Sequence, residues 1–151
     1  MTMQFDKEPN MNLIMIVDDE PGVLNALRRL LKTRPCHYGQ LTYSLEVETF
    51  DSPVAALMRA KEGGIDLVLT DYMMPQMDGV EFLKQFRVLQ PDAARIVLSG
   101  MADLDDVMRA ITEVDTSRFL PKPWNDSLLL ATIAEALTFR SLQLESRGRQ
   151  P

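Results

Sequence analysis

Short apolar runs alternate with amphipathic stretches along this chain, and this alternation constrains the fold more than any other feature. The apolar runs have the length of strands, and the stretches between them place apolar residues at helical spacing. We predict strands at 12–17, 43–50, 65–70, 94–99 and 117–121, and helices at 21–33, 53–63, 79–90, 103–114 and 125–145. Five strands alternating with five helices predict an α/β fold, a doubly wound five-stranded parallel sheet with helices on both faces.

The length of 151 residues suits one compact domain. We expect a polar tail at 1–11, the domain at 12–138, and an extension of the last helix or a linker at 139–151. Pro121 lies inside the fifth predicted strand, where it cannot donate a ladder hydrogen bond, so this strand is expected at an edge of the sheet.

Polar residues follow several predicted strands directly. In doubly wound folds, ligands bind beyond the carboxyl ends of the strands, which meet at one rim of the sheet. The residues at these ends are Asp18, Asp19, Glu20, Asp71, Ser99 and Lys122. Three aspartates from two strands should therefore lie close together.

Carboxylates that lie this close repel one another, and a divalent cation would remove the repulsion. A site with oxygen ligands only, and with room for water and phosphate, suits Mg²⁺. Lys122 adds a positive charge and Ser99 adds a hydroxyl. This set of groups is suited to phosphoryl transfer onto a carboxylate.

Four motifs carry a resemblance to a known family. They are "VDDEP" (17–21), "LTDYMMPQMDG" (69–79), "VLSG" (97–100) and "FLPKPW" (119–124). In this order and on these strand ends they resemble the receiver domain of bacterial two-component response regulators, over residues 12–137. The resemblance implies the flavodoxin-like receiver fold, with strand order 2-1-3-4-5, and a phosphorylation-dependent signalling switch.

The resemblance also implies the roles of the acidic residues. Asp71 would be the phosphoacceptor. Asp19 and Asp71 would bind Mg²⁺ directly, Asp18 would assist through a water, and Met73 would contribute its backbone carbonyl. Pro75 and Gly79 would shape the loop after the acceptor.

The remaining roles concern the phosphoryl group. Lys122 and Ser99 would bind it, and Ser99 with Phe119 would form the switch that responds to it. The Lys122–Pro123 peptide bond is expected to be cis. Met73 and Met101 stand two residues after the acceptor and after the serine, where apolar side chains would shield the acyl phosphate from water and slow its hydrolysis.

Simpler interpretations apply to some of these residues taken singly. An Asp-Asp pair after a strand can cap a helix, Phe119 can belong to the core, and nothing assigns a catalytic role to Cys36 or His37. The link at 33–43 is longer than is usual in the family, and it is either a surface insertion or a contact for a partner.

Three other functions compete with this hypothesis. A haloacid-dehalogenase-type phosphatase would need a second acid two residues after the nucleophile, where Met73 stands. A flavin-binding module would need a phosphate-cradling loop after the first strand, where "DDEP" would repel phosphate. A receiver that binds partners without being phosphorylated is disfavoured by the intact acids, serine and lysine.

Composition sets limits on partners and location. The net charge of −6 argues against nucleic-acid binding. One cysteine, no apolar run long enough for a membrane span and no signal peptide predict a cytoplasmic protein.

The resemblance implies a histidine kinase or phosphotransfer protein as partner, and a homodimer through the face formed by 103–114, 117–121 and 125–145. Output would pass through a partner or a further domain, and no enzymatic activity on an outside substrate is expected.

Overall fold

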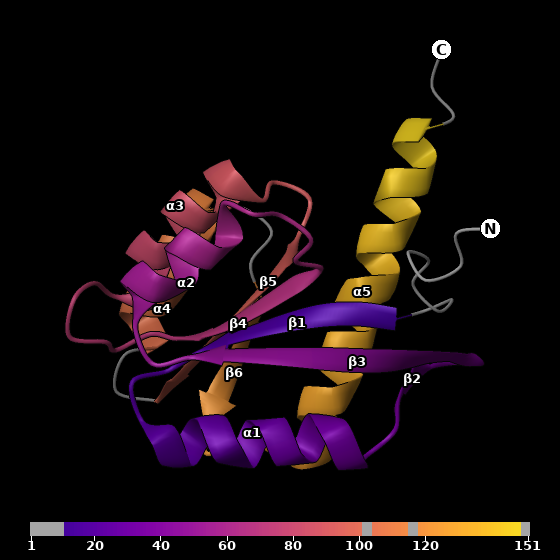
Figure 1. Ribbon diagram of the computed structural model, residues 1–151, viewed down its shortest axis with the longest axis horizontal. Helices are drawn as coiled ribbons and strands as arrows, with labels where there is room; N and C mark the ends of the chain where they lie inside the picture. Colours follow the sequence, from indigo (N-terminus) through magenta and orange to yellow (C-terminus); the bar gives the residue numbers. More distant parts are fainter. Residues whose placement is uncertain (1–10, 101–103, 115–117, 149–151) are drawn as a thin grey trace.

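The computed structural model describes residues 11–100, 104–114 and 118–148, and these form a three-layer α/β domain (Figure 1). The strands are β1 (Met11–Val17), β2 (Cys36–Tyr38), β3 (Leu41–Phe50), β4 (Leu67–Asp71), β5 (Ala94–Gly100) and β6 (Arg118–Lys122). The helices are α1 (Pro21–Thr33), α2 (Pro53–Ala60), α3 (Gly79–Leu89), α4 (Leu104–Val114) and α5 (Asp126–Gly148). None of the described helices is long and apolar enough to cross a membrane.

The sheet has the strand order β2-β3-β1-β4-β5-β6. The five predicted strands correspond to β1, β3, β4, β5 and β6, and they pair in parallel in the predicted order. Strand β6, which contains Pro121, lies at an edge, as predicted.

A sixth strand corrects the prediction of a purely parallel, five-stranded sheet. Strand β2 pairs antiparallel with the start of β3, so the link at 33–43 forms a hairpin. Gly39 in its turn has a φ of 61°, a conformation that glycine adopts without steric cost. The hairpin packs against α5. The buried Cys36 thiol donates to the Leu130 carbonyl at 3.7 Å, and Tyr43 shares a hydrogen bond with Thr138.

Each face of the sheet is covered by its own helices. Helices α1 and α5 pack on one face through residues such as Leu27 and Ile133, and α2, α3 and α4 pack on the other through Ala56, Phe82 and Val107. Strand β4 lies between these layers and is buried along its whole length. A strand that is covered on both faces reads as a continuous apolar run, which is why 65–70 was recognisable in the sequence.

Candidate functional site

The acidic cluster forms at the carboxyl ends of two neighbouring central strands. Strands β1 and β4 are paired, and their last register pair is Val17 with Thr70. Asp18 and Asp71 therefore follow on adjacent strands at the same level, and Asp19 comes one residue later. Carboxylate oxygens of the three aspartates lie within 4.8 Å of one another. Asp18 and Asp71 are buried, whereas Asp19 is not.

Lys122, at the end of β6, bridges the two buried carboxylates. Its Nζ lies 2.9 Å from Oδ2 of Asp18 and 2.9 Å from Oδ1 of Asp71. The other oxygen of Asp18 accepts a hydrogen bond from the Glu20 backbone N–H at 2.9 Å. Asp18 therefore holds the lysine in place while its own carboxylate is fixed by the first residues of the following loop.

Burial and charge act on the ionisation of this cluster in opposite directions. Burial raises the pKa of Asp71, the Lys122 hydrogen bond lowers it, and the negative charges of Asp18 and Asp19 raise it further, so the pKa lies above its ordinary value. Burial alone would lower the pKa of Lys122, but its hydrogen bonds to Asp71 and Asp18 raise it above its ordinary value. Lys122 thus stays charged, and the cluster would gain from additional positive charge.

The hydroxyl and aromatic residues of the predicted site come from the next two strands. Ser99 is buried near the end of β5, and its hydroxyl donates to the Gly100 carbonyl oxygen at 3.2 Å. Phe119 is partly buried and packs against the core formed with α2, α3 and α4. The Lys122–Pro123 peptide bond is cis. Met73 lies in the loop after β4 with 59% of its surface exposed, and Met101 lies outside the described residues.

The start of α3 lies against the backbone of Asp71 and Tyr72. The Gly79 N–H donates to the Tyr72 carbonyl at 2.7 Å, and a Cβ atom at position 79 would lie 2.3 Å from the Asp71 carbonyl oxygen. Asp78 caps this helix by accepting a hydrogen bond from the Glu81 N–H at 2.8 Å. Position 79 therefore needs a residue without a side chain. From the sequence we expect Gly79 only to shape the loop after Asp71, and the structure adds its direct contact with the Asp71 backbone.

Comparison with known proteins shows which family this chain belongs to. Residues 14–134 match the model of the response regulator receiver domain family. This chain belongs to that family. Membership of this family favours a receiver over the two competing hypotheses, a haloacid-dehalogenase-type phosphatase and a flavin-binding module.

Individual relatives agree with this assignment. The receiver is 34% identical over 130 residues to the hydrogenase transcriptional regulatory protein HoxA of Cupriavidus necator, covering 86% of this chain and 25% of that protein. A response regulator receiver domain protein from Clostridium thermocellum has a TM-score of 0.76 and 29% identity, with 87% of this chain and 98% of that chain covered. A protein of Neptuniibacter caesariensis has a TM-score of 0.79 and 35% identity, with 93% and 97% covered. The receiver thus spans about a quarter of the length of HoxA.

Family membership indicates which metal and which partners to expect at the acidic cluster. Receiver domains bind Mg²⁺ at an acidic pocket, and they interact with histidine kinases or phosphotransfer proteins. The donor set of this receiver fits Mg²⁺, because three clustered carboxylates offer hard oxygen ligands and leave coordination positions for water or phosphoryl oxygens.

One feature of the receiver site went beyond the sequence-based hypothesis. The sequence predicts that Lys122 binds the phosphoryl group, and in the structure it also binds Asp18, which lies 104 residues earlier in the chain. No local pattern around either residue signals this contact. The parallel order of the strands, which puts both residues on one rim, is the only signal in the sequence that could have suggested it.

Proposed function

We propose that this receiver is a switch in which Asp71 accepts a phosphoryl group from a histidine kinase or a phosphotransfer protein. The observation that carries the proposal is the Asp71 carboxylate at the end of a central strand, 2.9 Å from Lys122 Nζ and clustered with Asp18 and Asp19. A buried nucleophile with a cation beside it and room for a metal fits in-line phosphoryl transfer.

The proposed reaction follows from these contacts. A carboxylate oxygen of Asp71 attacks phosphorus, the bond from phosphorus to the donor histidine nitrogen breaks, and its electron pair stays on the imidazole. The Lys122 ammonium moves its hydrogen bond from Asp71 to a phosphoryl oxygen, while Asp18 keeps the lysine in place. Asp18, Asp19 and Asp71, with the carbonyl of Met73, would hold Mg²⁺, which supplies positive charge against the phosphoryl oxygens.

The proposed response to phosphorylation begins at Ser99. Its hydroxyl now donates to the Gly100 carbonyl, and a phosphoryl oxygen on Asp71 would be a charged and stronger acceptor. Rotation of Ser99 toward the phosphoryl group would release the neighbouring backbone, and Phe119, on the adjacent strand β6, would follow by changing its rotamer.

Further parts of the proposal concern the protein beyond this site. A homodimer would use the face of α4, β6 and α5, and Met108 of α4 is exposed. Output would pass to a partner or another domain, and the only catalysis would be of the receiver's own phosphorylation and dephosphorylation. A cytoplasmic location is supported by the single cysteine. A receiver that works without phosphorylation is the alternative, which the substitution of Asp71 tests.

Asp19→Asn should weaken Mg²⁺ binding at least about tenfold, because even residues that only support metal ligands typically change affinity by 10–100-fold. Asp19 suits this test better than Asp18, which also binds Lys122 and the Glu20 N–H. Isothermal titration with MgCl₂ measures the effect. Asp51→Asn, at the end of β3 outside the acidic cluster, is the control with the same change in charge. An unchanged affinity in Asp19→Asn would remove Asp19 from the proposed site.

Met73→Asn should shorten the lifetime of the phosphorylated receiver by roughly tenfold or more, since a polar side chain near the acyl phosphate can orient the attacking water. The measurement is the decay of phosphorylated protein in excess Mg²⁺, followed by intact mass. Met58→Asn is the matched control, because Met58 is a similarly exposed methionine on α2. Equal decay in Met73→Asn and the parent would show that Met73 does not shield the phosphoryl group.

A further inference from the structure

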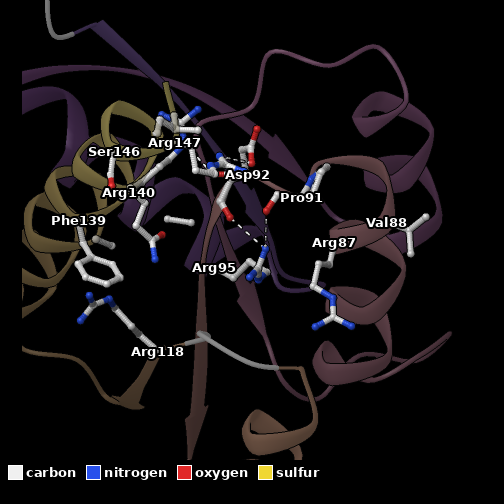
Figure 2. Close-up of a pocket in the computed structure, with 15 residues that line it drawn as sticks. Arg87, Val88, Pro91, Asp92, Arg95, Arg118, Phe139, Arg140, Ser146 and Arg147 are labelled. Atoms are coloured by element: carbon white, nitrogen blue, oxygen red, sulfur yellow. Dashed lines mark hydrogen bonds and ion pairs between the residues drawn. The ribbon is translucent and has the colours of Figure 1, made fainter. Parts of the chain in front are cut away.

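A second concave site lies at the opposite end of the sheet from Asp71. It is a cavity of about 970 Å³ between the end of α3, the amino-terminal ends of β5 and β6, and the outer half of α5 (Figure 2). Asp71 and Lys122 lie at the carboxyl ends of their strands, so this cavity is separate from the proposed phosphorylation site. Its volume falls in the range of small-molecule binding sites, which is roughly 300–1,000 Å³.

Positive charge gathers at this cavity in a chain whose net charge is −6. Its wall contains five arginines but only one acidic residue, Asp92. The arginines are Arg87 from α3, Arg95 from β5, Arg118 from β6, and Arg140 and Arg147 from α5. Guanidinium groups bind phosphate and carboxylate groups through paired, charge-assisted hydrogen bonds.

Several of these arginines are held in position by the protein. Arg95 is only 7% exposed, and its guanidinium donates to the backbone carbonyl of Ala93 at 3.1 Å. Arg140 donates to the Asp92 carbonyl at 2.8 Å and pairs with Asp66 at 3.1 Å. Arg147 donates to an Asp92 carboxylate oxygen at 2.7 Å. Fixed guanidinium groups lose little conformational entropy when they bind a ligand, and a guanidinium group carries five N–H donors in all.

An aromatic surface adjoins the charged part of the cavity. Phe139 is 50% exposed, and the guanidinium carbon of Arg118 lies 6.0 Å from the centre of its ring. Arg118 is also paired with Glu135. Figure 2 shows Arg118 and Phe139 facing each other at one side of the cavity, with Arg95 toward its middle and Arg87 across it on α3. An aromatic ring and a guanidinium plane are both surfaces on which a nucleobase stacks.

We propose that this arginine-lined cavity binds a nucleotide, with its phosphates on the arginines and its base against Phe139 and Arg118. The concave shape favours a small ligand over a protein partner, which would need a contact area of about 800 Å² on each side. The ligand's phosphates compete with the Asp92 carboxylate for Arg147. This competition predicts opposite effects from removing the arginines and from removing Asp92.

The test is isothermal titration of the whole chain with ADP and, separately, with inorganic pyrophosphate. We expect saturable ADP binding that is tighter than pyrophosphate binding. It should be at least about tenfold weaker in Arg87→Gln, which loses charged hydrogen bonds to phosphate, and in Arg118→Gln, which loses the guanidinium plane beside the base. Asp92→Asn should bind ADP more tightly than the parent. Arg29→Gln, an exposed arginine of α1 outside the cavity, is the control and should bind ADP like the parent.

Specific results would overturn the proposal. These are no ADP binding at millimolar concentration, equal affinity in the parent and both cavity variants, or equal losses in Arg29→Gln and Arg118→Gln. If pyrophosphate binds as tightly as ADP, the base contributes nothing to binding, and the ligand is not specifically a nucleotide. Circular dichroism and beryllofluoride binding should be unchanged in the arginine variants, which separates this site from Asp71.

Discussion

Asp71→Asn should abolish phosphorylation of this receiver by acetyl phosphate in the presence of Mg²⁺. The amide that replaces the carboxylate has no anionic oxygen to attack phosphorus, and it also removes one ligand from the acidic cluster. Phosphoryl incorporation, measured by intact mass, should fall to the background of a reaction without acetyl phosphate. Beryllofluoride, which mimics the phosphoryl group, should likewise fail to bind.

The control for this substitution is Asp78→Asn. Asp78 lies in the same loop and caps α3. Asparagine caps helices as well as aspartate does, so Asp78→Asn should keep the fold while it removes the same charge as Asp71→Asn. We expect the Asp78 variant to incorporate phosphate like the parent. Equal incorporation in Asp71→Asn and the parent would contradict Asp71 as the acceptor. No incorporation in the parent itself would favour a receiver that acts without phosphorylation.

Gly79→Ala should destabilise the fold by about 1–3 kcal/mol, the usual cost of forcing extra atoms into a packed site. The new Cβ would lie 2.3 Å from the Asp71 carbonyl oxygen and 3.0 Å from the Tyr72 Cα. Both of these are backbone atoms, which cannot rotate away as the end of a flexible side chain can. Helix α3 or the end of β4 has to move, so we also expect slower phosphorylation of Asp71. Urea unfolding and the acetyl phosphate reaction measure the two effects.

Gly22→Ala is the matched control for Gly79→Ala. Gly22 also lies in the first turn of a helix, but a Cβ atom there would meet nothing within 4 Å. Alanine at such a position should leave stability unchanged or raise it by up to about 1 kcal/mol, because it restricts the unfolded chain. If Gly79→Ala unfolds at the same urea concentration as the parent, the contact at Asp71 is not rigid.

The arginine-lined cavity shows what sequence patterns miss. Its arginines come from α3, β5, β6 and α5, and each of them reads in the sequence as an ordinary charged residue of its own element. Arg95 sits in an apolar strand, yet it is buried and bonded to backbone carbonyls. Nothing local in the sequence indicates that these side chains share one cavity.

The hairpin of β2 and β3 was missed for a related reason. Three residues, Cys36–Tyr38, are too few to show a periodicity of either kind, and the segment reads as a polar link. Its strand character comes from pairing with Leu41–Tyr43 and from burial of Cys36 beneath α5, close to Leu130. That burial raises the Cys36 pKa to about 11, which keeps the thiol protonated and suits a packing role.

The sequence by itself determined the type and order of the main helices and strands and the acidic residues at the strand ends. Periodicity, caps and strand-ending carboxylates are local properties, and a parallel sheet puts all strand ends on one rim whatever the details of packing. Only the tertiary structure decided that Lys122 bridges Asp18 and Asp71, that Gly79 touches the Asp71 backbone, and that five arginines surround one cavity. The Lys122 contacts join residues far apart in the chain, the arginines come from four elements, and the Gly79 contact depends on how α3 packs against the end of β4. Strand register and helix packing decide all of these, and no local pattern encodes them.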